Sequence, residues 1–310
     1  MSYGLPYQGS KNRIAKRLVE ALPAAPVLYD VFCGGCAVTH AAMLSGRYQR
    51  FVVNDLRGWL PDAFQKAIHG GYAHEDRWIS REDFERLRST DAYAAMCFSF
   101  GNNCWSYMYA RPLEPYKRAL HYAIFWRDFA PWAALCPETA DALAAGLAQI
   151  EDRKQRRIRA GHFIIESLKA QLAAGMLTPD ILDKPIYRQI RKAKDTPHSL
   201  ERLERLERLP GALTAYSMDY REMRFDEPGI IYCDPPYKDT ADCGEDYTEP
   251  FCHDEFYSWC EAQKLPVYIS EYQMPEERFA CVAEWDRVTY MAAKTTTHVT
   301  ERLWRPRTQL

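Results

Sequence analysis

Residues 27–55 contain a strand, a glycine turn, a helix and a second strand in direct succession, and this pattern limits the possible folds more than any other. The apolar run 27–32 reads as a buried strand, Gly34-Gly35 as a tight turn, 38–44 as a helix and 51–53 as the second strand. About 30 residues of this pattern make one βαβ unit, and such units build parallel sheets. We therefore expect an α/β fold.

The strand pattern stops near residue 56 and resumes only after residue 211. The segment between is largely helical, with a helix start expected at Ser80 and an alanine-rich apolar stretch at 140–150. Further strands are expected at 212–216, 230–233, 267–270, 280–285 and 288–292. These patterns predict a discontinuous α/β domain over residues 1–56 and 212–310, interrupted by a mostly helical insertion over residues 57–211.

The last helix of this insertion, residues 200–209, repeats leucine at every third position. Leucines at that spacing drift by roughly 60° per step around an α-helix, so we expect only two or three of them in the core. Glu201 with Arg205 and Glu204 with Arg208 have the i,i+4 spacing that stabilises an exposed helix. The repeat therefore indicates a solvated helix surface.

The composition is typical of a globular protein. Of the 310 residues, 47% are hydrophobic, and no run approaches the roughly 18 apolar residues of a membrane span. The first residues lack the basic and then apolar pattern of a secretion signal. Ten cysteines are scattered among apolar neighbours, as thiols are in a reducing compartment. We expect a soluble, cytoplasmic protein that needs no disulfides.

Cys33 and Cys36 form a Cys-x-x-Cys pair, a motif of zinc and redox sites. A second pair with finger-like spacing is absent from the sequence, and Cys243, Cys252 and Cys260 are irregularly spaced. The sequence therefore predicts no metal site.

The segment Asp234-Pro235-Pro236-Tyr237 directly follows the strand expected at 230–233. Two prolines end that strand and stiffen the backbone. The turn would hold a carboxylate, the Pro235 carbonyl and an aromatic face together at the sheet edge where open α/β folds bind ligands. The two oxygens can accept both N–H protons of the exocyclic amine of a flat base, while the Tyr237 ring stacks on that base. The alternative is a strand-ending turn with an incidental acid.

Gly34 and Gly35 allow the backbone to approach a ligand closely, and Asp55 follows the second glycine by 20 residues. This spacing suits a carboxylate that binds ribose hydroxyls. The dinucleotide pattern G-x-G-x-x-G is incomplete, so an adenosine ligand without a pyrophosphate fits better, and S-adenosylmethionine is the obvious candidate. A glycine turn with a capping Asp55 is the structural alternative.

Two more segments have residues that suit the same ligand. Tyr7-Gln8-Gly9-Ser10-Lys11 precedes a helix expected at 11–22 and could present N–H groups and a cation to a carboxylate. The alternative is an ordinary helix start capped by Ser10. Asp219 follows the strand 212–216 and could accept the adenine amine of the cofactor, or it could only form a turn.

Together these motifs resemble the DNA adenine-N6 methyltransferases of the Dam or D12 class, over roughly residues 3–56 and 212–304. The residues that match the family pattern are Tyr7, Gly9, Lys11, Phe32-Cys33-Gly34-Gly35, Asp55 and Asp234-Pro235-Pro236-Tyr237. Cys36 stands where glycine is usual. The resemblance implies a Rossmann-like fold that uses S-adenosylmethionine, in a bacterium or a phage-infected cell.

The resemblance also assigns roles to residues. It implies that S-adenosylmethionine is held by Tyr7, Gln8, Gly9, Lys11, Asp30, Phe32, Gly34, Gly35, Asp55 and Asp219. It implies that Asp234, Pro235, Pro236 and Tyr237 grip an adenine flipped out of double-stranded DNA, with no metal required.

The same resemblance implies that the insertion recognises the DNA target. Residues 98–109 look like an aromatic and amide segment of phage-type members, and the expected DNA contacts are Asn102, Asn103, Tyr107, Arg111, Lys117 and Arg118. Packing of an aromatic core is the alternative. Residues 153–208 carry 14 Lys and Arg against 7 Asp and Glu, so a polyanion would meet this segment first, unless it is only a solvated helical surface.

Three other functions compete with this one. Methylation of RNA adenine or of protein glutamine uses similar chemistry, although those families more often have asparagine in place of Asp234. A catalytically silent DNA-binding protein would not need the intact set of Tyr7, Lys11, Asp55 and Asp234. A nicotinamide-dependent oxidoreductase fits least, because the pyrophosphate loop is incomplete.

Overall fold

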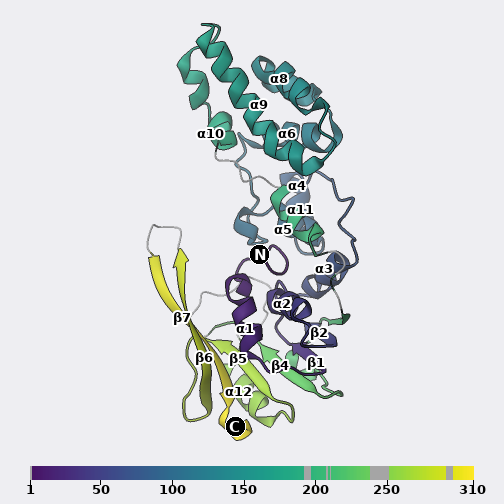
Figure 1. The fold of residues 1–310 in the computed structure, drawn as a ribbon, viewed down its shortest axis with the longest axis vertical. Coiled ribbons are helices and arrows are strands. Elements are labelled where there is room, and N and C mark those ends of the chain that lie inside the picture. The colour runs from purple at the N-terminus through teal and green to yellow at the C-terminus, as the bar shows by residue number, and fades with distance from the viewer. Residues whose placement is uncertain (1, 192–196, 207–208, 210, 238–250, 291–295) are drawn as a thin grey trace. The chain divides into compact units, whose positions relative to one another are not determined.

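The computed structural model describes residues 2–191, 197–206, 209, 211–237, 251–290 and 296–310 (Figure 1). The chain divides into two compact units. Unit 1 is Met1–Gly71 with Leu206–Leu310, and unit 2 is Tyr72–Arg205.

Unit 1 contains a seven-stranded sheet in the order β3-β2-β1-β4-β5-β7-β6. The strands are β1 Val27–Asp30, β2 Arg50–Asn54, β3 Ala212–Tyr216, β4 Gly229–Cys233, β5 Val267–Glu271, β6 Phe279–Tyr290 and β7 Thr296–Pro306. The first five run parallel, while β7 is antiparallel to both β5 and β6. The strand order reverses direction at β1 and β4, and ligands bind at such a switch point in open α/β sheets.

Helices pack against this sheet and confirm the α/β prediction. The helices of unit 1 are η1 Lys11–Arg13, α1 Ala15–Ala21, α2 Ala37–Ser45, α3 Trp59–Ile68, η4 Tyr220–Glu222, α12 His253–Ala262 and η5 Arg307–Gln309. The core joins Phe256 and Cys260 of α12 to Tyr29, Ile231 and Ile269 of the central strands. The fold of unit 1 is therefore Rossmann-like.

The sequence prediction was wrong at the antiparallel end of the sheet. The two strands expected at 280–285 and 288–292 are one strand, β6, with a bulge between Cys281 and Ala283; residues 291 and 292 lie outside the described residues. Strand β7, which pairs along β6 in Figure 1, was not predicted. Its pattern is hidden because a charged residue, Glu301, occupies a buried position.

Unit 2 is helical apart from one isolated bridge between Ser99 and Tyr107 in its described part. Its helices are α4 Arg81–Leu87, α5 Ala92–Cys97, η2 Phe100–Asn102, α6 Glu114–Trp126, α7 Ala130–Leu135, α8 Pro137–Ala148, α9 Arg153–Ala173, η3 Pro179–Asp183, α10 Pro185–Arg191 and α11 Pro197–Glu204. Ser80 caps α4 as expected, accepting the backbone N–H of Asp83. Within the described ranges, no helix has both the length and the apolarity to span a membrane.

Helix α11 and the residues after it differ from the expected solvated surface. Leu200, Leu203 and Leu206 are all buried, which agrees with two or three core leucines. Glu201 is buried as well and pairs with Arg157 of α9 at 2.7 Å. The surface prediction was therefore wrong for Glu201, because packing against α9 covers that side of the helix; Arg208 lies outside the described residues.

Candidate active site

Four neighbouring strands of unit 1 each deliver an acid at their carboxyl ends. Asp30 ends β1, Asp55 directly follows β2, Asp234 directly follows β4, and Asp219 lies three residues beyond β3. The register aligns Asp30 with Val53 of β2 and with the second-last residue of β4. The first three acids are therefore close neighbours at one edge of the sheet.

The glycine loop is shaped by hydrogen bonds to Asp55. The backbone N–H of Gly34, which has a φ of +46°, donates to Oδ2 of Asp55 at 2.9 Å, and that of Arg57 donates to Oδ1 at 3.0 Å. The N–H of Cys36 closes the turn on the Cys33 carbonyl at 2.7 Å. Cys36 has a φ of 53°, the left-handed region that favours glycine, so the structure accepts a side chain where the family usually has none.

The N-terminal segment lies over this loop. The N–H of Leu5 donates to the Gly35 carbonyl at 2.7 Å. A Cβ on Gly4 would lie 2.2 Å from that carbonyl oxygen, and one on Gly35 would lie 3.0 Å from Cβ of Tyr7. Only glycine fits at Gly4, because a side chain there would collide with the glycine loop beneath the N-terminal segment.

Tyr7 is fixed by a residue that the sequence did not single out. Arg57, a buried side chain, donates from Nη1 to the Tyr7 hydroxyl at 2.6 Å. Gln8 and Gly9 are exposed. The alternative of a helix cap at Ser10 finds no support, because its side chain makes no cap hydrogen bond to η1.

Asp30 is a buried carboxylate with unused acceptor capacity. The Thr39 hydroxyl donates to its Oδ2 at 2.6 Å, whereas Oδ1 has no hydrogen-bond partner among the described residues. Burial raises the pKa of Asp30 to about 7, and the charges of Asp234 and Asp55 act in the same direction. A positively charged ligand would relieve this unfavourable buried charge.

The Asp234 turn is joined to the N-terminal segment by Lys11. The Nζ atom of Lys11 lies 2.7 Å from Oδ1 of Asp234 and 4.4 Å from the centre of the Tyr237 ring. Burial raises the pKa of Asp234, and the Lys11 charge opposes that rise. One ammonium therefore contacts both groups that the sequence assigns to a flat base.

Glu301 of β7 completes this cluster and was missed by the sequence analysis. The Tyr237 hydroxyl donates to Oε2 of Glu301 at 2.8 Å, and Nζ of Lys11 lies 3.9 Å from the same oxygen. The Tyr237 ring also meets the Tyr272 ring edge to face, with centres 4.5 Å apart. The missed signal was the alternation of Glu301 with Leu303, both buried, within a charged segment.

A second missed residue, Asn54, ties the strand ends together. Its Nδ2 donates to the carbonyls of Val31 at 3.1 Å and Met218 at 3.0 Å, and its Oδ1 accepts the Met218 N–H at 3.0 Å. Because Asn54 is buried, these bonds replace water and hold the segment after β3 against β1 and β2.

Two predicted cofactor residues have other partners in this structure. Asp219 is gripped by Arg221, whose Nη2 and Nε lie 2.7 and 2.9 Å from its two oxygens, and this pairing lowers the pKa of Asp219. Phe32 packs in an aromatic cluster, edge to face with Phe251 and Phe256. These contacts favour the turn-forming alternative for Asp219 and a packing role for Phe32.

In unit 2, two predicted DNA contacts use their amides internally. Nδ2 of Asn102 donates to the Met96 carbonyl at 2.7 Å and to the Ser199 hydroxyl at 2.9 Å. Oδ1 of Asn103 accepts the backbone N–H groups of Trp105 and the next residue, as in an Asx turn. Such amides shape their own segment, which agrees with the structural alternative.

The other four predicted contacts divide by exposure. Tyr107 is buried, and its hydroxyl donates to the Ile79 carbonyl at 2.9 Å. Lys117 is also buried. Arg111 and Arg118 are exposed, so only these two of the six side chains have charged groups on an open surface of the unit.

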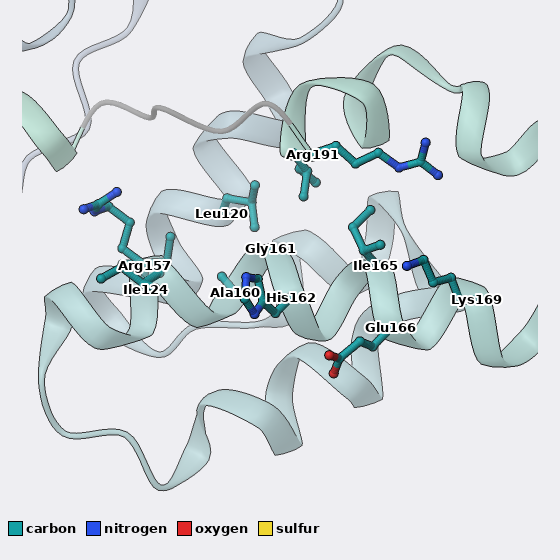
Figure 2. Close-up of a pocket in the computed structure, with 12 residues that line it drawn as sticks. Leu120, Ile124, Arg157, Ala160, Gly161, His162, Ile165, Glu166, Lys169 and Arg191 are labelled. Carbon is teal, nitrogen blue, oxygen red and sulfur yellow. The ribbon is translucent and has the colours of Figure 1, made fainter.

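Unit 2 also has a groove formed by α6, α9 and α10, which Figure 2 shows in close-up. Its charged and titratable lining residues are Arg157, His162, Glu166, Lys169 and Arg191, and the remaining lining residues are aliphatic or glycine. Arg157 is already paired with a buried acid, whereas the other four, one acid among them, are exposed. The charged residues of the groove come from the segment 153–208, whose positive balance was noted in the sequence.

Cysteines and metal ligands add no further site in the described ranges. There, no group of three or more His, Cys, Asp and Glu side chains could hold a metal ion. The nine described cysteines are free, and only Cys252 and Cys281 among them are exposed; Cys243 lies outside the described residues.

The comparisons with known proteins agree with the resemblance found in the sequence. Residues 7–101 match the model of the D12 class N6 adenine-specific DNA methyltransferase family. No curated protein matches the chain. The matched region includes Lys11, the glycine loop and Asp55, whereas Asp234, Tyr237 and Glu301 lie outside it.

Proposed function

With the D12 class match as premise, we propose that this chain transfers a methyl group from S-adenosylmethionine to the N6 amine of adenine in double-stranded DNA. One observation outside the matched residues 7–101 supports the proposal. Asp234 and Tyr237, at the end of β4, meet Lys11 from the matched N-terminal segment within 2.7 and 4.4 Å. An acceptor carboxylate and an aromatic face are thus joined to the proposed cofactor site.

The cofactor would bind at the carboxyl ends of β1 and β2. When bound, S-adenosylmethionine supplies an activated methyl group on a positively charged sulfur. Asp30 would stabilise positive charge through Oδ1, which accepts no hydrogen bond from any described residue. Asp55 holds the loop and keeps further lone pairs for ribose hydroxyls, while Arg57 orients Tyr7.

The Asp234 turn would prepare the adenine amine for attack. The amine lone pair is delocalised into the base, which makes it a weak nucleophile. The Asp234 carboxylate and the Pro235 carbonyl would accept its two N–H protons and favour a more tetrahedral nitrogen, and Pro236 keeps the turn rigid. As the amine nitrogen takes the methyl group it has to lose one proton, and the adjacent Asp234 carboxylate would accept that proton.

The amine of a paired adenine is held within the duplex, so the base must be flipped out to reach this turn. The phosphate backbone would be bound by the helical unit. Support for that role comes from the exposed Arg111 and Arg118 and from the basic groove with Lys169 and Arg191.

The test is transfer of labelled methyl groups from S-adenosylmethionine to unmethylated duplex DNA of broad sequence content, with modified adenines mapped by single-molecule sequencing. Wild type should label adenine, Asp234→Ala should not, and the exposed Asp226→Asn should match wild type. If calorimetry shows that the cofactor binds but no DNA is labelled, the assignment of duplex DNA as the substrate is refuted. RNA and a glutamine-containing protein would then be the next substrates to assay.

A further inference from the structure

We propose that Glu301 is a positioning residue that receives the Lys11 ammonium when the target adenine takes its place on Asp234. The inference rests on the proposed function, because it concerns how that base is admitted. Lys11 lies 2.7 Å from Oδ1 of Asp234 and over the Tyr237 ring, so a base cannot use both groups until this ammonium moves.

Glu301 is placed to accept the displaced charge. Its Oε2 is 3.9 Å from Nζ of Lys11, so a movement of about 1 Å would form a charge-assisted hydrogen bond at ordinary distance. The side chains of Lys11 and Glu301 are 7% and 2% exposed. Because water cannot readily reach this ammonium, it needs a second buried carboxylate at contact distance once the adenine amine takes its place on Asp234.

The receiving carboxylate is held in position while the lysine moves. Glu301 lies within β7, where its Cα pairs with that of Trp285 on β6, so its backbone is fixed in the sheet. The Tyr237 hydroxyl donates to the same carboxylate at 2.8 Å, which fixes the ring on which the base would stack. The cluster thus has two anchored acids and one cation on a flexible side chain that can be shared between them.

The test uses duplex DNA with 2-aminopurine next to the target adenine at a site mapped with wild type. The target keeps its N6 amine, and the probe's fluorescence rises when the neighbouring adenine leaves the stack. Glu301→Gln keeps the volume and an acceptor for the Tyr237 hydroxyl but removes the charge. The flipped fraction and the single-turnover rate should fall by about 10-fold or more, with overall DNA affinity little changed. Glu284→Gln, which neutralises an exposed acid of β6 paired with Arg302, is the matched control and should behave as wild type.

A second comparison separates this role from a merely structural one. In Lys11→Met no charge has to be relocated, so adding Glu301→Gln should change the flipped fraction less than twofold. This comparison needs neither cofactor nor turnover, and it also serves if the single Glu301→Gln variant does not fold. Equal losses from Glu301→Gln with and without Lys11 would overturn the proposal, as would wild-type flipping in Glu301→Gln. If wild type itself methylates no DNA, the proposed function fails first and this inference falls with it.

Discussion

Replacing Asp30 with asparagine tests whether the protein keeps an unfavourable buried charge at its proposed cofactor site. Burial raises the pKa of Asp30 from its ordinary value of 3.8 to about 7 in the folded state. Between these values the folded protein holds a proton that the unfolded chain has lost. Stability therefore falls as the pH rises through this window and levels off above pH 7.

The size of the effect follows from the two pKa values. Between pH 5 and pH 8 the wild type should lose about 3 kcal/mol of stability through Asp30 alone, at about 1.4 kcal/mol for each tenfold change in proton affinity. Asp30→Asn cannot ionise, so this contribution disappears. Any constant change from placing an amide beside Thr39 cancels when the two pH values are compared within one variant.

The assay is urea unfolding of wild type, Asp30→Asn and the exposed control Asp226→Asn at pH 5, 6, 7 and 8. We expect the free energy of unfolding of Asp30→Asn, relative to that of wild type, to increase by about 3 kcal/mol as the pH rises from 5 to 8. The difference between Asp226→Asn and wild type should stay constant over the same range. Parallel curves for wild type and Asp30→Asn would refute the raised pKa. Calorimetry should also show S-adenosylmethionine releasing a proton near pH 6.5 from wild type but not from Asp30→Asn.

Three further predictions concern the N-terminal segment over the glycine loop, the strand ends held by Asn54, and the groove of unit 2 that is proposed to bind DNA. Gly4 and Gly46 both have a φ of +67°, but only at Gly4 would a Cβ lie 2.2 Å from a carbonyl oxygen. Gly4→Ala should therefore lower the melting temperature more than Gly46→Ala does, and it should also weaken cofactor binding. Asn54→Ala leaves two carbonyls and one N–H unpaired at the strand ends and should destabilise the protein by about 3 kcal/mol in urea; a loss below about 1 kcal/mol would contradict this accounting. Lys169→Glu with Arg191→Glu should weaken DNA binding and reduce the slope of log affinity against log salt by about 2, and an unchanged slope would exclude the groove as a phosphate contact.

Part of the candidate site could be predicted from the sequence, because some of its residues lie in or next to a single predicted strand or turn. Asp55 and Asp234 could be placed from the sequence alone, since each follows an apolar run that reads as a parallel strand, and Asp30 lies within such a run. Residues whose surroundings come from elsewhere in the chain could not be read this way. Asp219 looks identical in sequence whether it meets a ligand or Arg221, and only the structure supplies the arginine.

The amides of unit 2 show the same limit. Asn102 and Asn103 have the chemistry to read adenine edges, and the sequence cannot exclude it. In the structure Asn102 bonds to Ser199, which is 97 positions away, and Asn103 forms its own turn. Glu301 shows the converse, because an acid in a charged segment reads as exposed until the strands around it bury it.

The sequence by itself determined the α/β class, the helical interruption and the chemical groups at the strand ends, because these depend on periodicity and on residues next to one another in the chain. The tertiary structure decided which groups meet. It brought Lys11, Asp234 and Glu301 from three distant segments into contact, and it placed Arg57 within hydrogen-bond distance of the Tyr7 hydroxyl. The physical reason is that burial and pairing of charges depend on long-range packing, and these set the protonation and the partners on which the proposed chemistry depends.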